Sequence, residues 1–372
     1  MFGLVWFMSG SAAAGGGAAT DAYDGIDPGT RLDVHGFLDV FALRNFNHPI
    51  SGKNQLRAFD FAANQVALGY ARITLAHRPQ RVGFRVDAGF GDTAQVFEAD
   101  DPASVDHPHL ARAASFVQQA FATAMVPLPR ELELELDAGR FGTPVGLEDN
   151  ESLPNWNYGR SLLFSWAEPT LHTGLRATCR LTPRLAASLF WVNGWNSVVI
   201  DGNGMRTFAG GVTFQASDTV EVVLVTMVGP EHPPAELAGP LAFRAIVDGS
   251  IVYAPLDAAA FAVTADYGHD RANGGVDWWG AAWYAHLQTP RWLAAALRGE
   301  ILSDPSGFIT GTPQLLTELT LTGEVRGTVR RARLVGRLEV RRDLSNALVF
   351  EAPAPASSRQ QSTVTAALLA AY

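Results

Sequence analysis

Acidic side chains recur at every second position in one stretch of the sequence. Residues 131–138 place Glu131, Glu133, Glu135 and Asp137 on one side, and three leucines and an alanine on the other. A catalytic acid/base pair needs two carboxyl groups whose environments separate their pKa values. Four regularly spaced carboxylates do not provide such a pair. The row instead predicts the water-facing side of a β-strand in the wall of a pore.

A second charged pattern lies near the end of the chain. If residues 317–325 and 329–341 form a hairpin around Arg326–Thr328, Glu318 lies near Arg337. The same register brings together Glu324 with Arg330 or Arg331. Opposite charges across two strands stabilise a sheet by roughly 0.2–1 kcal/mol for each pair. Two interpretations stay open, because the charges either neutralise each other or leave Arg333 and Arg341 in surplus. Surplus arginines would make part of the lumen positive and favour anions.

The long segment 143–169 is the candidate for a constriction. It carries the acids Glu148, Asp149 and Glu151 and then the polar aromatic run Trp156, Asn157 and Tyr158. Folded inward, its acids would face wall arginines, namely Arg176, Arg180 or Arg298. A transverse field of this kind filters solutes by charge. The alternative is an acidic external loop that binds divalent cations or simply faces solvent.

Other reactive residue types give weaker patterns. His107 and His109 flank Pro108 without a partner Cys/His motif, so we expect a solvated loop and no metal site. Cys179 is the only cysteine, which excludes a disulfide within the chain. No serine lies in a G-x-S-x-G setting. A barrel-embedded lipid hydrolase, the least favoured alternative, would use His172 with Ser161 or Ser165. We therefore expect no enzyme activity and no cofactor.

The elements that must hold these residues are strands with two different faces. Apolar and polar residues alternate with period two, as in Val82, Phe84 and Val86 against Arg85 and Asp87. Short turns alternate with long loops. The expected turns are 77–81, 127–130, 182–184, 216–218, 255–257, 289–291 and 326–328. The expected loops are 47–60, 93–110, 143–169, 194–206, 229–240, 269–275, 303–313 and 343–361.

This division leaves about sixteen strands of roughly 9–16 residues, enough to cross a hydrocarbon layer when tilted. Short periplasmic turns, long extracellular loops and an even strand count are typical of outer-membrane barrels. After residue 20 no run of about 18–20 apolar residues occurs, so a transmembrane helix is not expected. The predicted fold is an all-β, closed antiparallel transmembrane β-barrel.

Composition agrees with a barrel in a membrane. Charged residues make up 17% of the 372 residues, and the net charge of −9 leaves no basic stripe for nucleic acid. Residues 1–20 resemble the remnant of a signal peptide, although no Lys or Arg precedes Arg31. Residues 31–372 then form a single barrel domain. The final strand alternates to a terminal aromatic, Tyr372, which we expect in an aromatic belt with Trp283, Phe84 and Trp191.

Several segments resemble the OmpL-like β-barrel porin family of bacterial outer membranes. They are GFLDVFALRNFN (36–47), VGFRVDAGFGDTA (82–94), LDAGRFGTPVGLE (136–148), NWNYGRSLLFSWAEPTLHTGLRATCRLTP (155–183), VNGWNSVVIDGNG (192–204), DPSGFITGTPQ (304–314) and RLEVRRDLSN (337–346). The resemblance covers about residues 31–350, and 155–183 is its most specific part. Cys179 stands where an aromatic is expected, and Tyr372 replaces the commoner Phe. The resemblance implies a pore-forming barrel.

We therefore expect a porin of the bacterial outer membrane that passes small hydrophilic solutes or ions passively. The alternatives are a substrate-selective channel, the lipid hydrolase, and a soluble all-β binding protein. Expected partners are outer-membrane lipid, lipopolysaccharide and two further copies in a homotrimer. The candidate pore-lining or constriction residues are Arg85, Asp87, Glu133, Glu135, Asp137, Glu148, Asp149, Glu151, Arg176, Arg180, Arg298, Glu300, Glu318, Arg333, Arg337 and Glu339.

Overall fold

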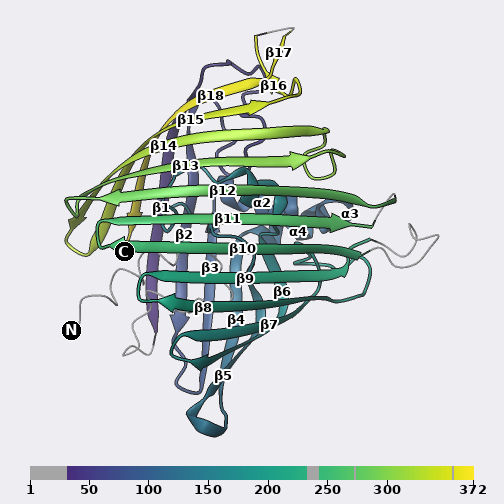
Figure 1. The fold of residues 1–372 in the computed structure, drawn as a ribbon, viewed down its shortest axis with the longest axis vertical. Helices are drawn as coiled ribbons and strands as arrows, with labels where there is room; N and C mark the ends of the chain where they lie inside the picture. The colour runs from purple at the N-terminus through teal and green to yellow at the C-terminus, as the bar shows by residue number, and fades with distance from the viewer. Residues whose placement is uncertain (1–31, 233–242, 272–273, 354–355) are drawn as a thin grey trace.

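A computed structural model describes residues 32–232, 243–271, 274–353 and 356–372. The candidate signal remnant at residues 1–20 lies outside these ranges. Sixteen strands form one closed barrel, in which successive strands are hydrogen-bonded neighbours and the last strand also pairs with the first (Figure 1). All of these pairs are antiparallel. The predicted fold class and strand number are confirmed.

The barrel strands are 8 to 16 residues long. Their bounds are β1 Asp33–Asn45, β2 Gln65–His77, β3 Val82–Phe90, β4 Val117–Pro127, β5 Glu133–Gly142, β6 Leu171–Thr182, β7 Leu185–Val192, β8 Thr207–Ser217, β9 Val220–Pro230, β10 Phe243–Leu256, β11 Ala259–Asp270, β12 Val276–Gln288, β13 Leu293–Asp304, β14 Gln314–Val329, β15 Ala332–Ser345 and β18 Gln360–Ala371. The other elements are α2 Asp92–Asp100, α3 Ala103–Asp106, α4 Pro108–Ser115, the short helical turns Pro129–Glu131 and Leu163–Ala167, and a small hairpin of β16 Phe350–Glu351 and β17 Ser357–Ser358.

The two ends of the barrel differ, as expected from the sequence. Short turns join the strands at one end, which we call the turn end, and long loops join them at the other, the loop end. In Figure 1 the turn end is at the left with the C-terminus, and α2, α3, α4, β16 and β17 lie toward the loop end at the right. No described helix is long and apolar enough to cross a membrane.

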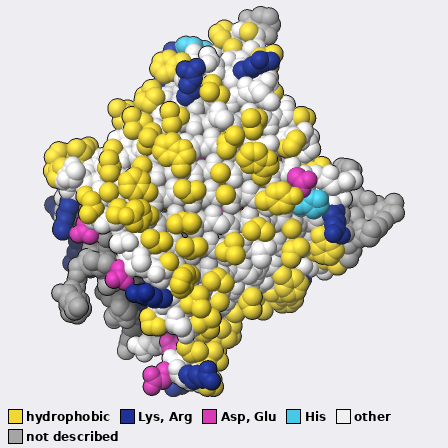
Figure 2. Space-filling view, viewed as in Figure 1, with side chains coloured by type: hydrophobic (Ala, Val, Ile, Leu, Met, Phe, Trp, Pro, Cys, Tyr) yellow, Lys and Arg dark blue, Asp and Glu magenta, His cyan; other side chains and the backbone are white. Residues whose placement is uncertain are grey.

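On the side of the barrel drawn in Figure 2, hydrophobic side chains are spread over the wall and charged side chains lie at its margins. Leucine, valine and isoleucine side chains that alternate along the strands point outward and are exposed, for example Ile73, Leu189 and Leu368. The four expected belt aromatics, Phe84, Trp191, Trp283 and Tyr372, are also exposed on the outer face. A closed ring leaves no strand edge unpaired, so the backbone is satisfied without water.

The hairpin of β14 and β15 differs from the sequence prediction. The strands extend to Val329 and Ala332, so the turn is Arg330–Arg331 and not Arg326–Thr328. Consequently Glu318 lies opposite Asp343 and not near Arg337, and Glu324 lies opposite Arg337 and not near Arg330 or Arg331. The backbone instead turns at Arg330, a non-glycine residue with a φ of 58°.

The inner face is of two kinds. On β13, β14 and β15 the inward side chains are mostly charged or polar, as predicted. On β7, β9 and β10 several of them are apolar and buried, and these form a cluster with Phe121, Phe141, Val145 and partly buried Trp195, whereas Ser188 of β7 and Asp248 of β10 are buried polar residues. The inward members from these three strands are Phe190, Val192, Val223, Val225, Met227 and Ile246. The expectation of a wet inner face therefore holds for only part of the wall.

Candidate functional site

The segment between β5 and β6, residues 143–170, crosses the inside of the barrel, and we call it loop 3. On one side, Ser152 Oγ donates to the Asp39 carboxylate of β1 at 2.6 Å. On the other side, the Leu162 backbone N–H donates to Glu300 of β13 at 2.7 Å. Asp39 and Glu300 lie near the middle of their strands. Loop 3 therefore folds into the lumen at about half its height and is not an external loop.

Contacts within loop 3 add to those with the wall. The Asn155 amide closes a tight turn, because its Oδ1 accepts from Asp149 N at 2.8 Å and its Nδ2 donates to Asp149 O at 2.9 Å. A short helical turn over Leu163–Ala167 then packs on β12. Gly280 of β12 leaves room for Leu163 there, since a Cβ at Gly280 would overlap the Leu163 side chain.

Arginines of the wall bind the loop through its backbone carbonyls. Arg337 Nη1 donates to Ser152 O at 2.5 Å, and its Nη2 donates to Asn155 O at 2.7 Å. The same kind of contact joins Arg298 to Gly159 O at 2.7 Å and Arg341 to Arg160 O at 2.5 Å. A guanidinium presents five N–H donors in a fixed fork, so one side chain can hold two turns of backbone.

Glutamates of the wall accept from the backbone amides of the same loop. Glu339 accepts from Tyr158 N at 2.6 Å and from Gly159 N at 2.9 Å. Glu300 accepts from Leu162 N and Leu163 N. Hydrogen bonds with a charged partner are about twice as strong as neutral ones. Arginine side chains of the wall thus donate to carbonyls of the loop, and glutamate side chains between them accept from its amides.

Arg298 is the centre of the charged contacts. Its Nη1 lies 2.6 Å from Glu148 Oε1 of loop 3, and its Nε lies 3.1 Å from Glu318 Oε2. Glu300 is within 3.7 Å of the same nitrogen, and Tyr284 donates to Glu148 at 3.2 Å. Arg298 is fully buried. Removing one partner of such a buried group leaves an uncompensated charge, which is strongly destabilising.

The opposite side of the lumen contributes a second ion pair to loop 3. Arg72 of β2 lies 2.5 Å from Glu151 Oε1 and 3.1 Å from Asp87 Oδ1. Burial raises the pKa of Glu151 to about 7, although the nearby Arg72 charge acts in the other direction. Tyr158 OH also donates to Asp39 at 3.0 Å. Loop 3 is thus tied to both sides of the barrel.

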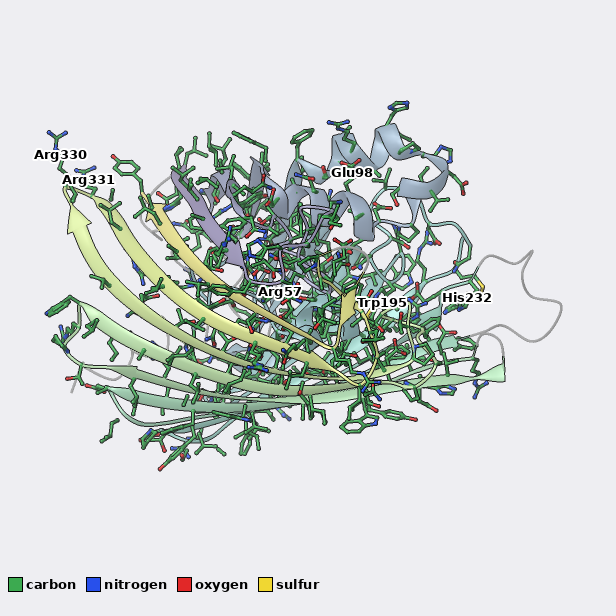
Figure 3. The ribbon with its side chains drawn as sticks, turned by 90° about the horizontal axis from the view of Figure 1, so that it is seen from above. Arg57, Glu98, Trp195, His232, Arg330 and Arg331 are labelled. Carbon is green, nitrogen blue, oxygen red and sulfur yellow. The ribbon has the colours of Figure 1, made fainter. Side chains whose placement is uncertain are left out.

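Loops 1 and 2, residues 46–64 and 91–116, cover loop 3 from the loop end. Phe59 of loop 1 and Phe164 of loop 3 have ring centroids 5.7 Å apart, and Val96 of α2 joins the same apolar cluster. Arg57 of loop 1 donates to Thr363 of β18 at 2.8 Å. Figure 3 shows Arg57 and Trp195 between the opposite walls of the barrel. The lumen is therefore densely packed at and above loop 3.

The turn end is more open and carries charges of both signs. Glu133, Arg180 and Arg333 are exposed there. Closer to loop 3, Arg176 pairs with Asp137 at 2.8 Å. The Arg85 and Asp87 side chains, both on β3, are 3.0 Å apart. Charge therefore remains accessible to solvent mainly on the turn side of loop 3.

All sixteen candidate residues lie on inward faces of strands or in loop 3. Glu148 meets Arg298, one of its three expected partners, whereas Glu151 meets Arg72, which we did not expect. Asp149 caps the backbone of Glu151 and reaches no wall arginine. The pairing of Arg341 with Asp343 at 2.7 Å removes it from the supposed surplus. Sequence reasoning missed Asp39 and Arg72, although both alternate with other inward residues of their strands.

The residues considered for hydrolysis do not assemble into a serine–histidine pair. His172 Nε2 lies 3.2 Å from Thr143 Oγ1, and its Nδ1 lies 3.1 Å from Gly194 O. Ser161 Oγ accepts from the Phe164 backbone at 3.0 Å. His107 and His109 lie at the start of α4 and are exposed.

Comparison with known families gives one match. The model of a family described as "Putative beta-barrel porin-2, OmpL-like" matches residues 31–372. The match spans all of the residues that the structure describes. No curated protein matches the sequence.

Several solved structures share the fold at low sequence identity. An anion-selective porin from Comamonas acidovorans is 11% identical with a TM-score of 0.57, and the alignment covers 92% of this chain and 99% of that one. Salmonella typhi OmpF in complex with daunomycin is 12% identical with a TM-score of 0.59, covering 91% and 97%. A trimer form of Vibrio cholerae OmpT is 11% identical with a TM-score of 0.55, covering 93% and 99%.

Proposed function

Because the chain belongs to the OmpL-like β-barrel porin family, we propose that loop 3 is the constriction of its pore. The protein is a porin of the bacterial outer membrane, through which small hydrophilic solutes diffuse passively. A constriction at mid-height, between an open turn end and a packed loop end, would restrict passage to solutes small enough to pass loop 3. Movement of loop 3 against the wall would set the conductance.

One observation carries this proposal, namely that loop 3 is held across the lumen by charged groups from both sides. Arg337 and Glu339 bind its backbone from β15, and Arg72 binds Glu151 from β2. A loop that merely covered the entrance would need no such ties at the middle of the strands. The energy of these contacts opposes a wide opening.

We propose weak charge selectivity. The charged groups beside loop 3 are largely paired, as Arg298 is with Glu148 and Glu318. The accessible turn end presents Arg180 and Arg333 together with Glu133. Selective pores concentrate one sign of charge at the narrow point, and these pairs oppose such a concentration. A substrate-selective channel remains the alternative, and saturable, competitive uptake into liposomes would favour it.

Conductance in planar bilayers tests the constriction. We expect the wild type to give discrete conductance steps, and the double variant Arg337→Met, Glu339→Gln to give larger steps because loop 3 loses backbone ties on β15. Arg184→Ala, at an exposed pair in a turn, serves as the control and should match the wild type. Equal steps in the wild type and the double variant would contradict the constriction. Absence of steps for the wild type in several salts would contradict the open pore itself.

We further propose a homotrimer in the membrane. An apolar groove of about 600 Å³ lies on the outer face of β18, β1, β2 and β3, lined by small and apolar residues such as Gly36, Ala71, Ala88 and Ala370. Side chains of a neighbouring copy would fit it, and the trimer form of the similar OmpT structure favours this arrangement. Ala71→Trp should lower the trimer fraction in cross-linking and native mass spectrometry. An unchanged fraction would contradict this contact surface. The remaining outer face would contact lipid and lipopolysaccharide.

We propose that the barrel has no hydrolytic activity. His172 binds Thr143 and Gly194 and not Ser161 or Ser165. Assays of phospholipid release by wild type and His172→Ala test this point. Release by the wild type that disappears in the variant would overturn it.

A further inference from the structure

Three carboxyl groups meet where loop 3 returns to the wall. Asp248 lies on β10, Asp266 on β11 and Glu168 near the end of loop 3, and all three are buried with exposed fractions of 0–5%. Asp248 and Asp266 are direct partners across the two strands. Like charges in this position destabilise a sheet. The register therefore favours a form in which the two groups are not both ionised.

The hydrogen bonds around these carboxyl groups are unevenly distributed. Asp248 accepts from Gly146 N at 3.3 Å and from Thr264 Oγ1 at 3.0 Å. Neither oxygen of Asp266 meets an N–H or hydroxyl donor, and neither does Glu168 Oε2. The other two carboxyl groups, those of Asp248 and Glu168, both interact with Asp266. A hydrogen bond between two carboxyl groups requires a proton on one of them.

No cation neutralises the cluster within the part of the chain that the structure describes. The ion pairs of loop 3 with Arg298 and Arg72 involve Glu148 and Glu151, not these three groups. A further acid, Glu148, also acts on Glu168. Burial, and then the neighbouring Asp248 charge, raise the pKa of Glu168 well above its ordinary value. A buried carboxylate without a cation is costly, so such a group takes up a proton.

A glycine makes the approach of loop 3 to this cluster possible. Gly146 has a φ of 95°, and a Cβ at this position would overlap Glu168 Oε2. The same glycine donates its N–H to Asp248. Both ends of loop 3 thus converge on the three carboxyl groups, with Gly146 at the start and Glu168 at the end.

We propose that Asp248, Asp266 and Glu168 form a proton-binding site that fastens both ends of loop 3 to β10 and β11. The proposal rests on the assignment of loop 3 as the constriction. With protons shared along the chain Asp248–Asp266–Glu168, the loop is fastened. When the protons are lost, two or three buried carboxylates repel one another, and the ends of the loop are released.

Loop 3 is fastened when the three carboxyl groups hold protons, and this sets the direction in which pH changes the conductance. A carboxyl group whose pKa is raised in the fastened state stabilises that state at low pH, and this stabilisation is lost as pH rises toward the raised pKa. Acidic conditions therefore favour the fastened loop, and alkaline conditions favour its release. Glu151 also titrates near neutral pH, so the comparison between variants, and not the wild-type curve alone, carries the result.

Infrared difference spectroscopy of the purified barrel tests the proton site without relying on conductance. Between acidic and alkaline pH, the wild type should show the carbonyl band of protonated, buried carboxyl groups. Asp266→Asn should reduce this band, whereas Asp257→Asn, in the exposed turn of the same hairpin, should leave it unchanged. An equal band in the wild type and Asp266→Asn would overturn the proton site. A heat-modifiability assay on gels establishes that each variant is folded.

Bilayer conductance over the same pH range tests the fastening. The wild type should conduct more as pH rises, and Asp266→Asn should lose most of this dependence, because an amide stays neutral and can donate to both neighbours. The variant Glu168→Gln should act in the same direction, and Asp257→Asn should follow the wild type. Full wild-type pH dependence in Asp266→Asn and Glu168→Gln would overturn the fastening. A wild type that conducts at no pH would contradict the pore, while the infrared result would still decide the proton site.

Discussion

Two stretches of the barrel wall hold loop 3 by different means. On β13 and β15, arginines and glutamates alternate, so that Arg337 takes loop carbonyls and Glu339 takes loop amides. On β10 and β11, the wall offers only acids, Asp248 and Asp266, to a third acid of the loop. The first contact includes arginines beside its carboxylates, since Arg298 lies within 3.7 Å of both Glu300 and Glu318. The second is balanced only when protons are bound.

The difference shows that two attachments of one loop can respond differently to the same solution. An arginine keeps its charge over the physiological pH range, because its ordinary pKa lies far above that range. Burial and neighbouring carboxylates raise the pKa of a carboxyl group such as Glu168 well above its ordinary value. We therefore expect changes on β13 and β15 to alter stability and conductance at every pH, and changes on β10 and β11 to alter mainly the pH dependence.

The largest effect should follow from Arg298→Met. This change removes the partner of Glu148 and Glu318 and two donors to loop carbonyls. Breaking a buried ion network by removing one partner costs about 3–5 kcal/mol. We expect a loss of this size in the free energy of unfolding, measured by urea titration of the detergent-solubilised barrel. A loss below about 1 kcal/mol would mean that the carboxylates are neutralised by another route.

A smaller effect should follow from Arg337→Lys. Lysine keeps the charge beside Glu324, 2.6 Å from the arginine Nε, but it cannot reach the carbonyls of Ser152 and Asn155 together. Loss of hydrogen bonds to a charged group costs roughly 1.5–3 kcal/mol. Single-channel conductance should increase at all pH values. If the conductance of Arg337→Lys increased only at alkaline pH, the attachments of loop 3 to β15 and to β10 would not be independent.

Gly146→Ala should affect the acidic attachment. The left-handed backbone disfavours alanine by about 1–3 kcal/mol, and the added Cβ displaces Glu168. We expect the pH dependence of conductance to weaken and a modest loss in the free energy of unfolding. Gly142→Ala is the matched control, because a Cβ there meets no atom within 4 Å. If conductance depended on pH in the same way in the wild type and in Gly146→Ala, Gly146 would not contribute to the proton site.

The smallest effect should follow from Arg184→Ala. Arg184 and Asp218 form an exposed pair in neighbouring turns, with side chains 58% and 76% exposed. Exposed pairs of this kind contribute at most about 1 kcal/mol and often nothing measurable. Urea unfolding and conductance should both match the wild type. A clear loss of stability would indicate that the turn end contributes more to the barrel than its exposure suggests.

Much of the fold could be predicted because the alternation of residue types reports directly on the two faces of a strand. The row of Glu133, Glu135 and Asp137 on β5 is an example, with Leu134 and Leu136 on the other face. The alternation fails on β9, where both faces of Val220–Pro230 are largely apolar. Here the inward side chains pack on other apolar side chains within the barrel. Because neither face meets water, polar and apolar residues do not alternate along this strand.

The candidate site was less predictable, because its contacts depend on register and on backbone groups. The wall arginines bind backbone carbonyls of loop 3. Because every residue has a backbone carbonyl, no acidic side chain in the loop marks these contacts in the sequence. The shift of the β14–β15 turn to Arg330 moved every cross-strand partner on those strands. Asp248 and Asp266 become neighbours only once β10 and β11 are paired. None of these relations is expressed as a local motif.

The pairing of β18 has a consequence for assembly. This strand pairs with β15 on one side and with β1 on the other, joining Ala371 to Phe37 across nearly the full length of the chain. Without β18, the facing edges of β1 and β15 would leave backbone N–H and C=O groups unpaired. Closure therefore depends on contacts between the most distant parts of the sequence, which makes folding slow. The ring can close only once β18 has paired with β1, so β1 waits for a partner that is synthesised more than 300 residues later.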